Sequence, residues 1–440
     1  MKQNGEKLLI KGGTVVDPAN GTEEKRDILI EDGLIQAVDK PGAFANVADA
    51  QVIDASDKLV TPGLIDIHVH LREPGFEWRE TILTGSQAAV AGGFTTVCCM
   101  PNTKPVNDHA QITDFILEQA KRANLCRVLP IGAITKGSNG EELAPMYELT
   151  KAGCVAFSDD GRPVMNAGIM RRALEYSLLF DTVLTVHEED VNLSDGFVMN
   201  ESALSIKLGL RGMPDAAENV MISRDIELAL LTGARVHFCH VSTARGVTLI
   251  KRAKEDGIPV TAEVMPHNLV LDETAIGEYD TNCKMSMPLR TQKDIEALLE
   301  GLRTGVIDCI SSDHAPHEPD SKNVEFDKAS FGILGLQTTL PLTLGLVREG
   351  KLSRQRAIES LTTDAARCLK LNIPSLSKGK PADVTIIDEG LSILHTSEMI
   401  RSKSKNTPFL NKTLIGNASH TIVGGRVVYA YEEFLRSIQK

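Results

Sequence analysis

The sequence predicts an α/β protein, a (β/α)8 barrel of the TIM type that carries a small β-sandwich domain formed from both chain ends. Two observations support this fold. Through the middle of the chain, apolar strand-like runs alternate with helical patterns, which is typical of a parallel sheet covered by helices. At both ends, short apolar alternations are closed by Gly, Asp or Pro, which is typical of strands and tight turns.

Both ends of the chain show the same pattern of short apolar alternation. Residues 7–60 contain KLLIKGGTVVD, RDILIEDGLIQAVD and AQVIDASDKLVTPG, which we interpret as antiparallel strands. PADVTIID (381–388) and ASHTIVGGRVVYA (418–430) repeat the pattern. We therefore expect the ends to pair, so that residues 1–61 and 377–440 form the small β domain and residues 62–376 form the barrel.

The central region contains eight strand candidates, the number that closes a barrel. The candidates are Leu64–Leu71, Thr95–Met100, Arg127–Thr135, Val155–Asp159, Thr182–Glu188, Arg235–Val241, Val260–Met265 and Val306–Ser312. The helices expected between them include Asp108–Ala123, Asn219–Leu231, Ala244–Asp256 and Gln292–Arg303. An open doubly wound sheet is the structural alternative. In a barrel, catalytic groups lie at the C-terminal ends of the strands.

Composition and charge indicate which kinds of molecule the protein binds and which compartment it occupies. The chain has 440 residues and a formal net charge of −12, so it offers no basic face to nucleic acid or to an anionic membrane, and a small-molecule substrate is favoured. The apolar runs are too short for a signal peptide or a membrane span. Its 8 cysteines show neither CxxC pairing nor a regular framework, which favours buried thiols in a reducing compartment and a cytoplasmic location.

Polar residues cluster where the barrel requires them. The first strand ends in His68-Val69-His70, and residues two apart on a strand share a face, so both imidazoles point into the barrel mouth as ligands of one metal should. Taken alone, such a pair is equally compatible with two ordinary histidines. Four further strands end near Asp160, His187, His240 and Asp313, respectively.

A single polar residue at a strand end is ordinarily a satisfied polar group or a helix cap. Coincidence at five strand ends instead favours one site. Four histidines and two carboxylates suit Zn²⁺, with Mn²⁺ or Co²⁺ as substitutes. We expect one or two ions at this site. Two are favoured, with Asp160 as the bridge, because six ligands are more than one tetrahedral ion needs. Because a bound metal lowers the pKa of water toward about 7, Asp313 is the expected catalytic acid–base that moves the proton.

Four motifs together resemble the class I dihydroorotases of the amidohydrolase superfamily, and the similarity covers essentially the whole chain. These motifs are His68-Val69-His70-Leu71-Arg72-Glu73-Pro74-Gly75, Met100-Pro101-Asn102-Thr103, Asp313-His314-Ala315-Pro316-His317 and Phe331-Gly332-Ile333-Leu334-Gly335-Leu336-Gln337. The resemblance implies reversible cyclisation of N-carbamoyl-L-aspartate to L-dihydroorotate, a step of pyrimidine biosynthesis.

The resemblance also implies the roles of individual residues. Metal ligands fall on His68, His70, Asp160, His187, His240 and Asp313, and substrate contacts fall on His70, Arg72, Asn102, His317, Phe331 and Gly332. Dihydroorotate carries a ring carboxylate, which the guanidinium of Arg72 suits. Without the resemblance, the Phe331–Gln337 segment is as well explained as a glycine-rich loop leading into a helix over residues 336–347.

Several alternatives remain. Hydantoinases and dihydropyrimidinases share the barrel and the histidines, but many bridge their metals with a carboxylated lysine, and here Lys151 precedes the fourth strand. Allantoinase is another enzymatic alternative. A catalytically silent scaffold relative is a further alternative, although all six ligand positions hold metal-binding residues. The resemblance also admits a homodimer and association with aspartate transcarbamoylase.

Other residues receive structural interpretations or stay open. Ser286 stands where the family commonly has Asn, so the resemblance does not carry the ring contact over to it, and we leave it outside the predicted site. His314 should point away from the cavity, whereas His317, beyond the strand, can reach in. Structural roles are expected for His109, His237, His267, His395 and His420.

Overall fold

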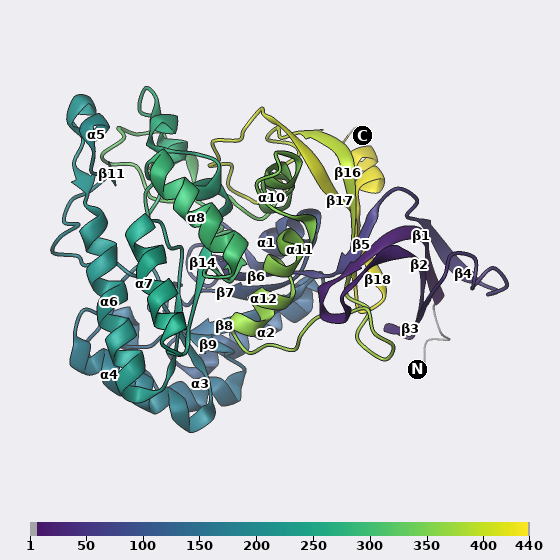
Figure 1. The fold of residues 1–440 in the computed structure, drawn as a ribbon, viewed down its shortest axis with the longest axis horizontal. Helices are drawn as coiled ribbons and strands as arrows, with labels where there is room; N and C mark the ends of the chain where they lie inside the picture. Colours follow the sequence, from purple (N-terminus) through teal and green to yellow (C-terminus); the bar gives the residue numbers. More distant parts are fainter. Residues whose placement is uncertain (1–6, 439–440) are drawn as a thin grey trace.

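Figure 1 presents a computed structural model that describes residues 7–438. The purple N-terminal strands and the green-to-yellow C-terminal strands lie together at one side of the view, and the helices surround the barrel at the other side. The predicted ends of the small β domain, residues 1–6 and 439–440, lie outside the described residues. The exact domain boundaries stay a prediction.

The barrel is a parallel sheet in the order β15-β14-β13-β10-β9-β8-β7-β6. Its strands are β6 (Leu64–Val69), β7 (Phe94–Cys99), β8 (Arg127–Gly132), β9 (Ala156–Phe157), β10 (Val183–Val186), β13 (Arg235–Phe238), β14 (Val260–Val264) and β15 (Cys309–Ile310). A parallel bridge between Val69 and His314 joins the two edges, and the backbone N–H of His70 donates to the carbonyl of His314 at 2.9 Å. The barrel prediction is therefore confirmed, and the open-sheet alternative is wrong.

All eight strand candidates are present, but each ends earlier than predicted. The helices that follow them along the chain are α1 (Ile82–Ala91), α2 (Ala110–Ala123), α3 (Met146–Ala152), α4 (Ala167–Ser177), α6 (Asp215–Thr232), α7 (Ala244–Glu255), α8 (Gln292–Thr304) and α10 (Thr339–Arg348). Local signals set their ends. For example, Thr291 and Asp294 form a capping box at the start of α8, and Gly305 closes the helix in the left-handed conformation.

The second sheet joins both chain ends in the order β18-β17-β16-β5-β1-β2-β3, with β4 also paired to β1. Its strands are β1 (Lys7–Asp17), β2 (Thr22–Glu31), β3 (Leu34–Asp39), β4 (Ala50–Asp54), β5 (Leu59–Pro62), β16 (Val384–Leu394), β17 (Thr413–Val423) and β18 (Arg426–Ala430). The pairing of the ends is confirmed. The expectation of antiparallel strands throughout is wrong, because β4 and β5 both run parallel to β1.

Shorter elements complete the described chain. They are α5 (Ala203–Leu208), α9 (Pro319–Lys322), α11 (Arg354–Ser360), α12 (Thr363–Cys368), α13 (Tyr431–Ile438), β11 (Met199–Asn200) and β12 (Gly212–Met213). Six 3-10 turns are η1 (Pro18–Asn20), η2 (Lys136–Ser138), η3 (Leu178–Phe180), η4 (Pro266–Leu269), η5 (Glu273–Ile276) and η6 (Thr281–Cys283). Within residues 7–438, none of the helices combines the length and apolar character needed to cross a membrane.

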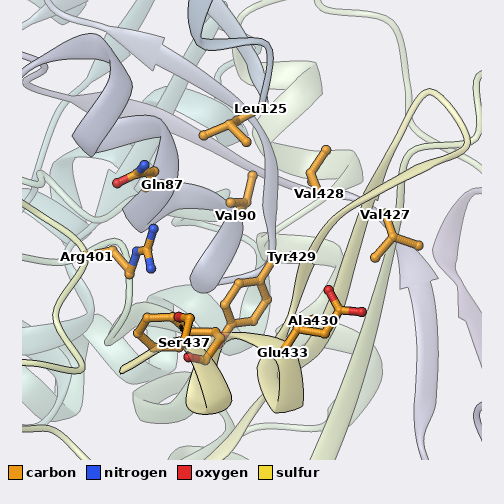
Figure 2. Close-up of a pocket in the computed structure, with 11 residues that line it drawn as sticks. Gln87, Val90, Leu125, Arg401, Val427, Val428, Tyr429, Ala430, Glu433 and Ser437 are labelled. Atoms are coloured by element: carbon orange, nitrogen blue, oxygen red, sulfur yellow. Dashed lines mark hydrogen bonds between the residues drawn. The ribbon is translucent and has the colours of Figure 1, made fainter. Parts of the chain in front are cut away.

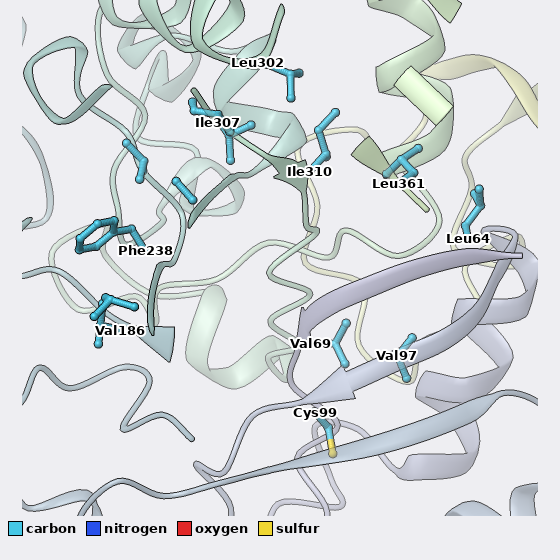
Figure 3. Packing of buried hydrophobic residues seen from close by; sticks show 14 of the residues in the cluster. Leu64, Val69, Val97, Cys99, Val186, Phe238, Leu302, Ile307, Ile310 and Leu361 are labelled. Carbon is cyan, nitrogen blue, oxygen red and sulfur yellow. The ribbon is translucent and has the colours of Figure 1, made fainter. Parts of the chain in front are cut away.

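Two apolar layers fix the direction of side chains on the barrel strands. Leu64, Val69 and Val97 belong to the large cluster between strands and helices (Figure 3), whereas Ile65 and Ile67 belong to a separate cluster within the barrel. The pairing of β6 with β7 shifts register between Asp66 and Val69. Alternation around this shift leaves the residues next to Val69, which are His68 and His70, free to face the barrel mouth.

Candidate metal centre and active site

The six predicted ligands converge at the C-terminal ends of five strands. His68 and His70 lie at the end of β6, and Asp160, His187, His240 and Asp313 follow β9, β10, β13 and β15, respectively. All six side chains are buried. His68 lies within the last residues of β6, and the other five ligands lie just beyond the ends of their strands. The predicted strands that included His70, His187 and His240 were therefore too long at this end.

Asp160 lies at the centre of the group. Its carboxylate oxygens lie 3.3 Å from His68 Nε2 and 3.4 Å from His70 Nε2. On the other side, His187 Nδ1 and His240 Nε2 lie 3.7 and 3.6 Å from Asp160 Oδ1. This is the position expected of a bridging carboxylate between two pairs of histidines.

Asp313 lies on the side of the first histidine pair. Its Oδ1 is 2.9 Å from His70 Nε2 and 3.5 Å from His68 Nε2. Burial opposes ionisation of Asp313, but the nearby His68 and the hydrogen bond from His70 outweigh it and lower the pKa of the carboxyl to about 2. An ionised carboxylate at neutral pH is able to accept a proton.

Unpartnered polar atoms show that the group fits a cation. His68 Nε2 and Asp160 Oδ1 are buried, face each other across 3.3 Å, and have no hydrogen-bond partner among residues 7–438. Buried polar groups are normally satisfied, because an unsatisfied one costs about 1–3 kcal/mol. His68, His70 and Asp313 form one set of donor atoms close enough to share an ion, and His68, Asp160 and His240 form another. Imidazole and carboxylate donors of this kind suit Zn²⁺.

The backbone is strained at three residues of this region. Arg72, His240 and Asp313 have φ angles of 61°, 37° and 42°, in the left-handed region that non-glycine residues rarely adopt. Each such residue costs on the order of 1–3 kcal/mol and persists only where the surrounding structure imposes it. Here the turn at each strand end redirects a side chain toward the shared cavity.

The predicted substrate residues line a cavity of about 450 Å³ beside the ligand group. Arg72 is 9% exposed; its Nε donates to the Pro316 carbonyl at 3.2 Å, and its terminal nitrogen lies 3.4 Å from His317 Nε2. Burial and the positive charge of Arg72 lower the pKa of His317 to about 2, so His317 is neutral and the guanidinium supplies the positive charge.

Other predicted substrate residues frame the same cavity. Asn102 Oδ1 lies 2.9 Å from His70 Nδ1, and Phe331 and Gly332 border the opening on the loop after α9. A side chain at Gly332 would clash with the Ala315 carbonyl and with His317, because an added Cβ falls 2.7 Å from both. The structure thus brings together every residue of the predicted site.

Sequence reasoning missed several lining residues. The additional ones are Gly161, Glu189, Phe197, Met285, Ser286, Ala315 and Ser330. Ser286, which we left outside the site, reaches the cavity, and its buried Oγ has no hydrogen-bond partner in the described part of the chain. Phe197 packs against Phe331 with ring centroids 4.9 Å apart. The loop that carries Phe197 follows β10 without a recognisable motif, so only the folded chain reveals its place.

Two carboxylates behind the ligands were also missed. Glu263 Oε1 lies 2.6 Å from His68 Nδ1, and Glu189 Oε2 lies 3.0 Å from His187 Nε2. Side chains alternate between the two faces of a strand, and Glu263 takes an interior-facing position on β14. This alternation was the sequence signal that could have identified Glu263.

Other histidines behave largely as expected. His314 turns away from the cavity and places Nε2 3.3 Å from Glu80 Oε2. His237 lies inside the barrel and contacts Thr261 Oγ1 at 2.8 Å and Glu263 Oε2 at 3.3 Å. All eight cysteines are buried free thiols, as the sequence predicts.

A second cavity shares no lining residue with the candidate site. It measures about 230 Å³ and is bordered by α1, β18 and α13, with Gln87, Arg401 and Tyr429 among its lining residues (Figure 2). None of the predicted ligands or substrate residues lines it.

An eight-stranded barrel whose strand ends bring four histidines and two aspartates around one cavity defines the class, an amidohydrolase-type barrel. A family model described as Dihydro-orotase-like matches residues 57–246. Proteins named dihydroorotase from Anaeromyxobacter sp. and Syntrophotalea carbinolica are 50% and 52% identical to the chain, covering 96% of it and 98% and 99% of their own length. The chain belongs to the dihydroorotase family.

Solved structures agree on the fold. The L-hydantoinase (dihydropyrimidinase) from Arthrobacter aurescens is 26% identical and superimposes with a TM-score of 0.86 over 96% of both chains. The dihydropyrimidinase from Brevibacillus agri is 23% identical, with a TM-score of 0.83 over 96% of this chain and 95% of its own. The shared architecture therefore extends well beyond the dihydroorotase family.

Proposed function

We propose that the protein is a dihydroorotase that interconverts L-dihydroorotate and N-carbamoyl-L-aspartate in pyrimidine biosynthesis. The observation that carries the proposal is the position of Arg72, whose buried guanidinium lines the cavity beside the six predicted metal ligands. A ring carboxylate is the substrate feature that such a group recognises. The relatives named dihydroorotase, about half identical over almost the whole chain, support the same activity.

In this proposal the residues that would hold Zn²⁺ are His68, His70, Asp160, His187, His240 and Asp313, and we favour two ions, with Asp160 as the ligand that both would share. The unpartnered His68 Nε2 and Asp160 Oδ1 support this assignment. Bound Zn²⁺ would polarise the ring amide and lower the pKa of water toward about 7. Metal analysis of the purified protein tests the stoichiometry: a value near two is expected, and a value near one removes the bridging role of Asp160.

Asp313 acts as the acid–base. Its carboxylate accepts the proton of the attacking water while the oxygen adds to the ring carbonyl carbon. As the amide C–N bond breaks, Asp313 donates that proton to the departing nitrogen, so that one residue serves both half-steps. In the reverse direction the same carboxylate takes the proton from the carbamoyl nitrogen.

The remaining residues orient the ring. Arg72 and Asn102 bind the ring carboxylate, and His70 and neutral His317 offer further hydrogen bonds. The backbone around Phe331 and Gly332 closes the other side of the cavity, where the absence of a side chain at Gly332 leaves room for His317. Fixing the ring in this way contributes to catalysis because the reacting atoms are held in a productive geometry.

A parallel assay tests the proposed substrate. Zinc-loaded protein is offered dihydroorotate, allantoin and hydantoin at equal concentrations. Dihydroorotate should be hydrolysed with the highest kcat/KM, because it alone carries the ring carboxylate for Arg72. Turnover of allantoin or hydantoin without turnover of dihydroorotate contradicts the proposal.

The cellular setting follows from the same proposal. The free buried cysteines support a reducing compartment such as the cytoplasm. A homodimer and an association with aspartate transcarbamoylase stay predictions, which light scattering of the protein alone and of the mixture tests.

A further inference from the structure

Glu263 is a buried carboxylate that lies beneath the ligand group and outside the cavity. It belongs to β14, faces the barrel interior and is 1% exposed. Its Oε1 lies 2.6 Å from His68 Nδ1, and its Oε2 lies 3.3 Å from His237 Nε2. Each oxygen therefore meets one imidazole. A buried carboxylate is unfavourable unless such partners satisfy it.

The contact with Glu263 determines what His68 offers to the ligand group. A carboxylate accepts hydrogen bonds, so the Nδ1 of His68 carries the proton that is donated to Oε1. The lone pair of a neutral imidazole then lies on Nε2, the atom that faces Asp160 at 3.3 Å and Asp313 at 3.5 Å. Glu263 thus holds both the tautomer and the ring orientation of His68.

His237 holds Glu263 in turn. Its Nδ1 lies 2.8 Å from Thr261 Oγ1 and its Nε2 contacts the second oxygen of Glu263. The three side chains form a buried series from Thr261 through His237 to Glu263, and this series ends on His68. The other described ligands with a partner behind the ring use less buried groups, Asn102 for His70 and Glu189 for His187.

We propose that Glu263 is a positioning residue that presents His68 Nε2 to a divalent cation and strengthens the site through its negative charge. The proposal rests on the proposed metal-dependent function. Carboxylates behind metal-ligating histidines typically contribute about 10- to 100-fold in metal affinity. Glu263 therefore acts on the reaction only through His68 and does not touch the substrate.

The test is the affinity of the metal-free full-length protein for Zn²⁺, measured by competition with a chromogenic chelator. Glu263→Gln keeps the size of the side chain and removes the charge, and its affinity should fall by about 10- to 100-fold. Glu80→Gln is the matched control, because Glu80 is equally buried and pairs with His314, which is not a predicted ligand. Its affinity should stay within about twofold of the wild type.

A second variant keeps the proposal testable if Glu263→Gln does not fold. Glu263→Asp retains the charge but is one methylene shorter, so it withdraws from His68 Nδ1 and should weaken Zn²⁺ binding by at least about fivefold. Wild-type affinity in either folded variant overturns the proposal. The readout involves no substrate, so it is independent of which ring the enzyme hydrolyses.

Discussion

Six buried side chains, four histidines and two aspartates, meet at the ends of five barrel strands and form the candidate metal centre. His68, His70 and Asp313 stand out because polar residues at the ends of apolar strands need an explanation. Glu263 escaped notice for the opposite reason, because it lies within a strand and not at its end. Ser286 was noticed but left outside the predicted site, because it stands where the family commonly has Asn, and the structure shows that it reaches the cavity.

Asp313→Ala should abolish most turnover while the protein stays folded. The lost carboxylate moves the proton between water and the leaving nitrogen, and general acid–base catalysis is typically worth about 10²- to 10⁴-fold. The measurement is kcat together with the thermal unfolding midpoint and the metal content. Near-normal kcat in the folded variant removes Asp313 from the mechanism.

Arg72→Met should weaken the use of dihydroorotate through the ring carboxylate. Hydrogen bonds to charged groups contribute about 1.5–3 kcal/mol, so kcat/KM should fall by about 10- to 150-fold. Arg79→Met is the matched control, because Arg79 pairs with Glu318 at 2.7 Å and does not line the cavity. Equal kcat/KM in the Arg72 variant and the wild type contradicts the assigned contact.

Strands, helices and loops were predicted with uneven success. The barrel strands and helices such as α7 and α8 were evident because long periodic segments give strong signals. Strand ends were placed too late, since the backbone turns at Arg72, His240 and Asp313 depend on tertiary contacts. The parallel pairing of β4 and β5 with β1 depends on how the chain passes between sheet edges, which local periodicity does not encode.

The loop after α9 is held by two buried lysines. Lys322 Nζ donates to the Ser330 carbonyl at 2.8 Å and to the Gly332 carbonyl at 3.2 Å, and Lys284 Nζ donates to the Phe326 carbonyl at 2.8 Å. Burial and the charge of Lys284 lower the pKa of Lys322 to about 7, although Asp280 and Cys283 oppose this shift. The loop that borders the cavity is thus held in place by hydrogen bonds from the titratable amine of Lys322.

The lowered pKa of Lys322 predicts that the stability of the folded protein depends on pH. Between pH 7 and the ordinary lysine pKa near 10.4, the unfolded chain holds a proton at this position that the folded protein has lost. The free energy of unfolding of the wild type, compared with Lys322→Met, should therefore rise as the pH increases through this window. Denaturant unfolding of both proteins at several pH values measures the difference. A difference that is constant or falls with pH contradicts the assignment.

In the whole molecule, a closed barrel surrounds a cluster of imidazole and carboxylate donors that suits a cation. The number of strand and helix units predicted the closed barrel. The apolar alternation at both ends of the chain predicted the small domain. The sequence predicted that Asp160 lies between the histidines, but not the distances around it, because these depend on how the five strand ends meet.

Removal of the metal should destabilise the folded protein. A ligand that binds only the native state raises the free energy of unfolding by about 4 kcal/mol at a concentration 1,000 times its Kd. Chelator-treated protein should therefore unfold at lower temperature than zinc-loaded protein, and added Zn²⁺ should restore the midpoint. Equal midpoints across a range of Zn²⁺ concentrations would show that the cation does not bind the folded state.

The most direct measurement is anomalous diffraction at the zinc edge from crystals grown with Zn²⁺ and dihydroorotate. We predict anomalous peaks about 2.0–2.2 Å from donor atoms of the six predicted ligands, with Asp160 contacting both ions and the ring carboxylate against Arg72. Absence of zinc from this group, or a ring whose carboxylate points away from Arg72, would contradict the account.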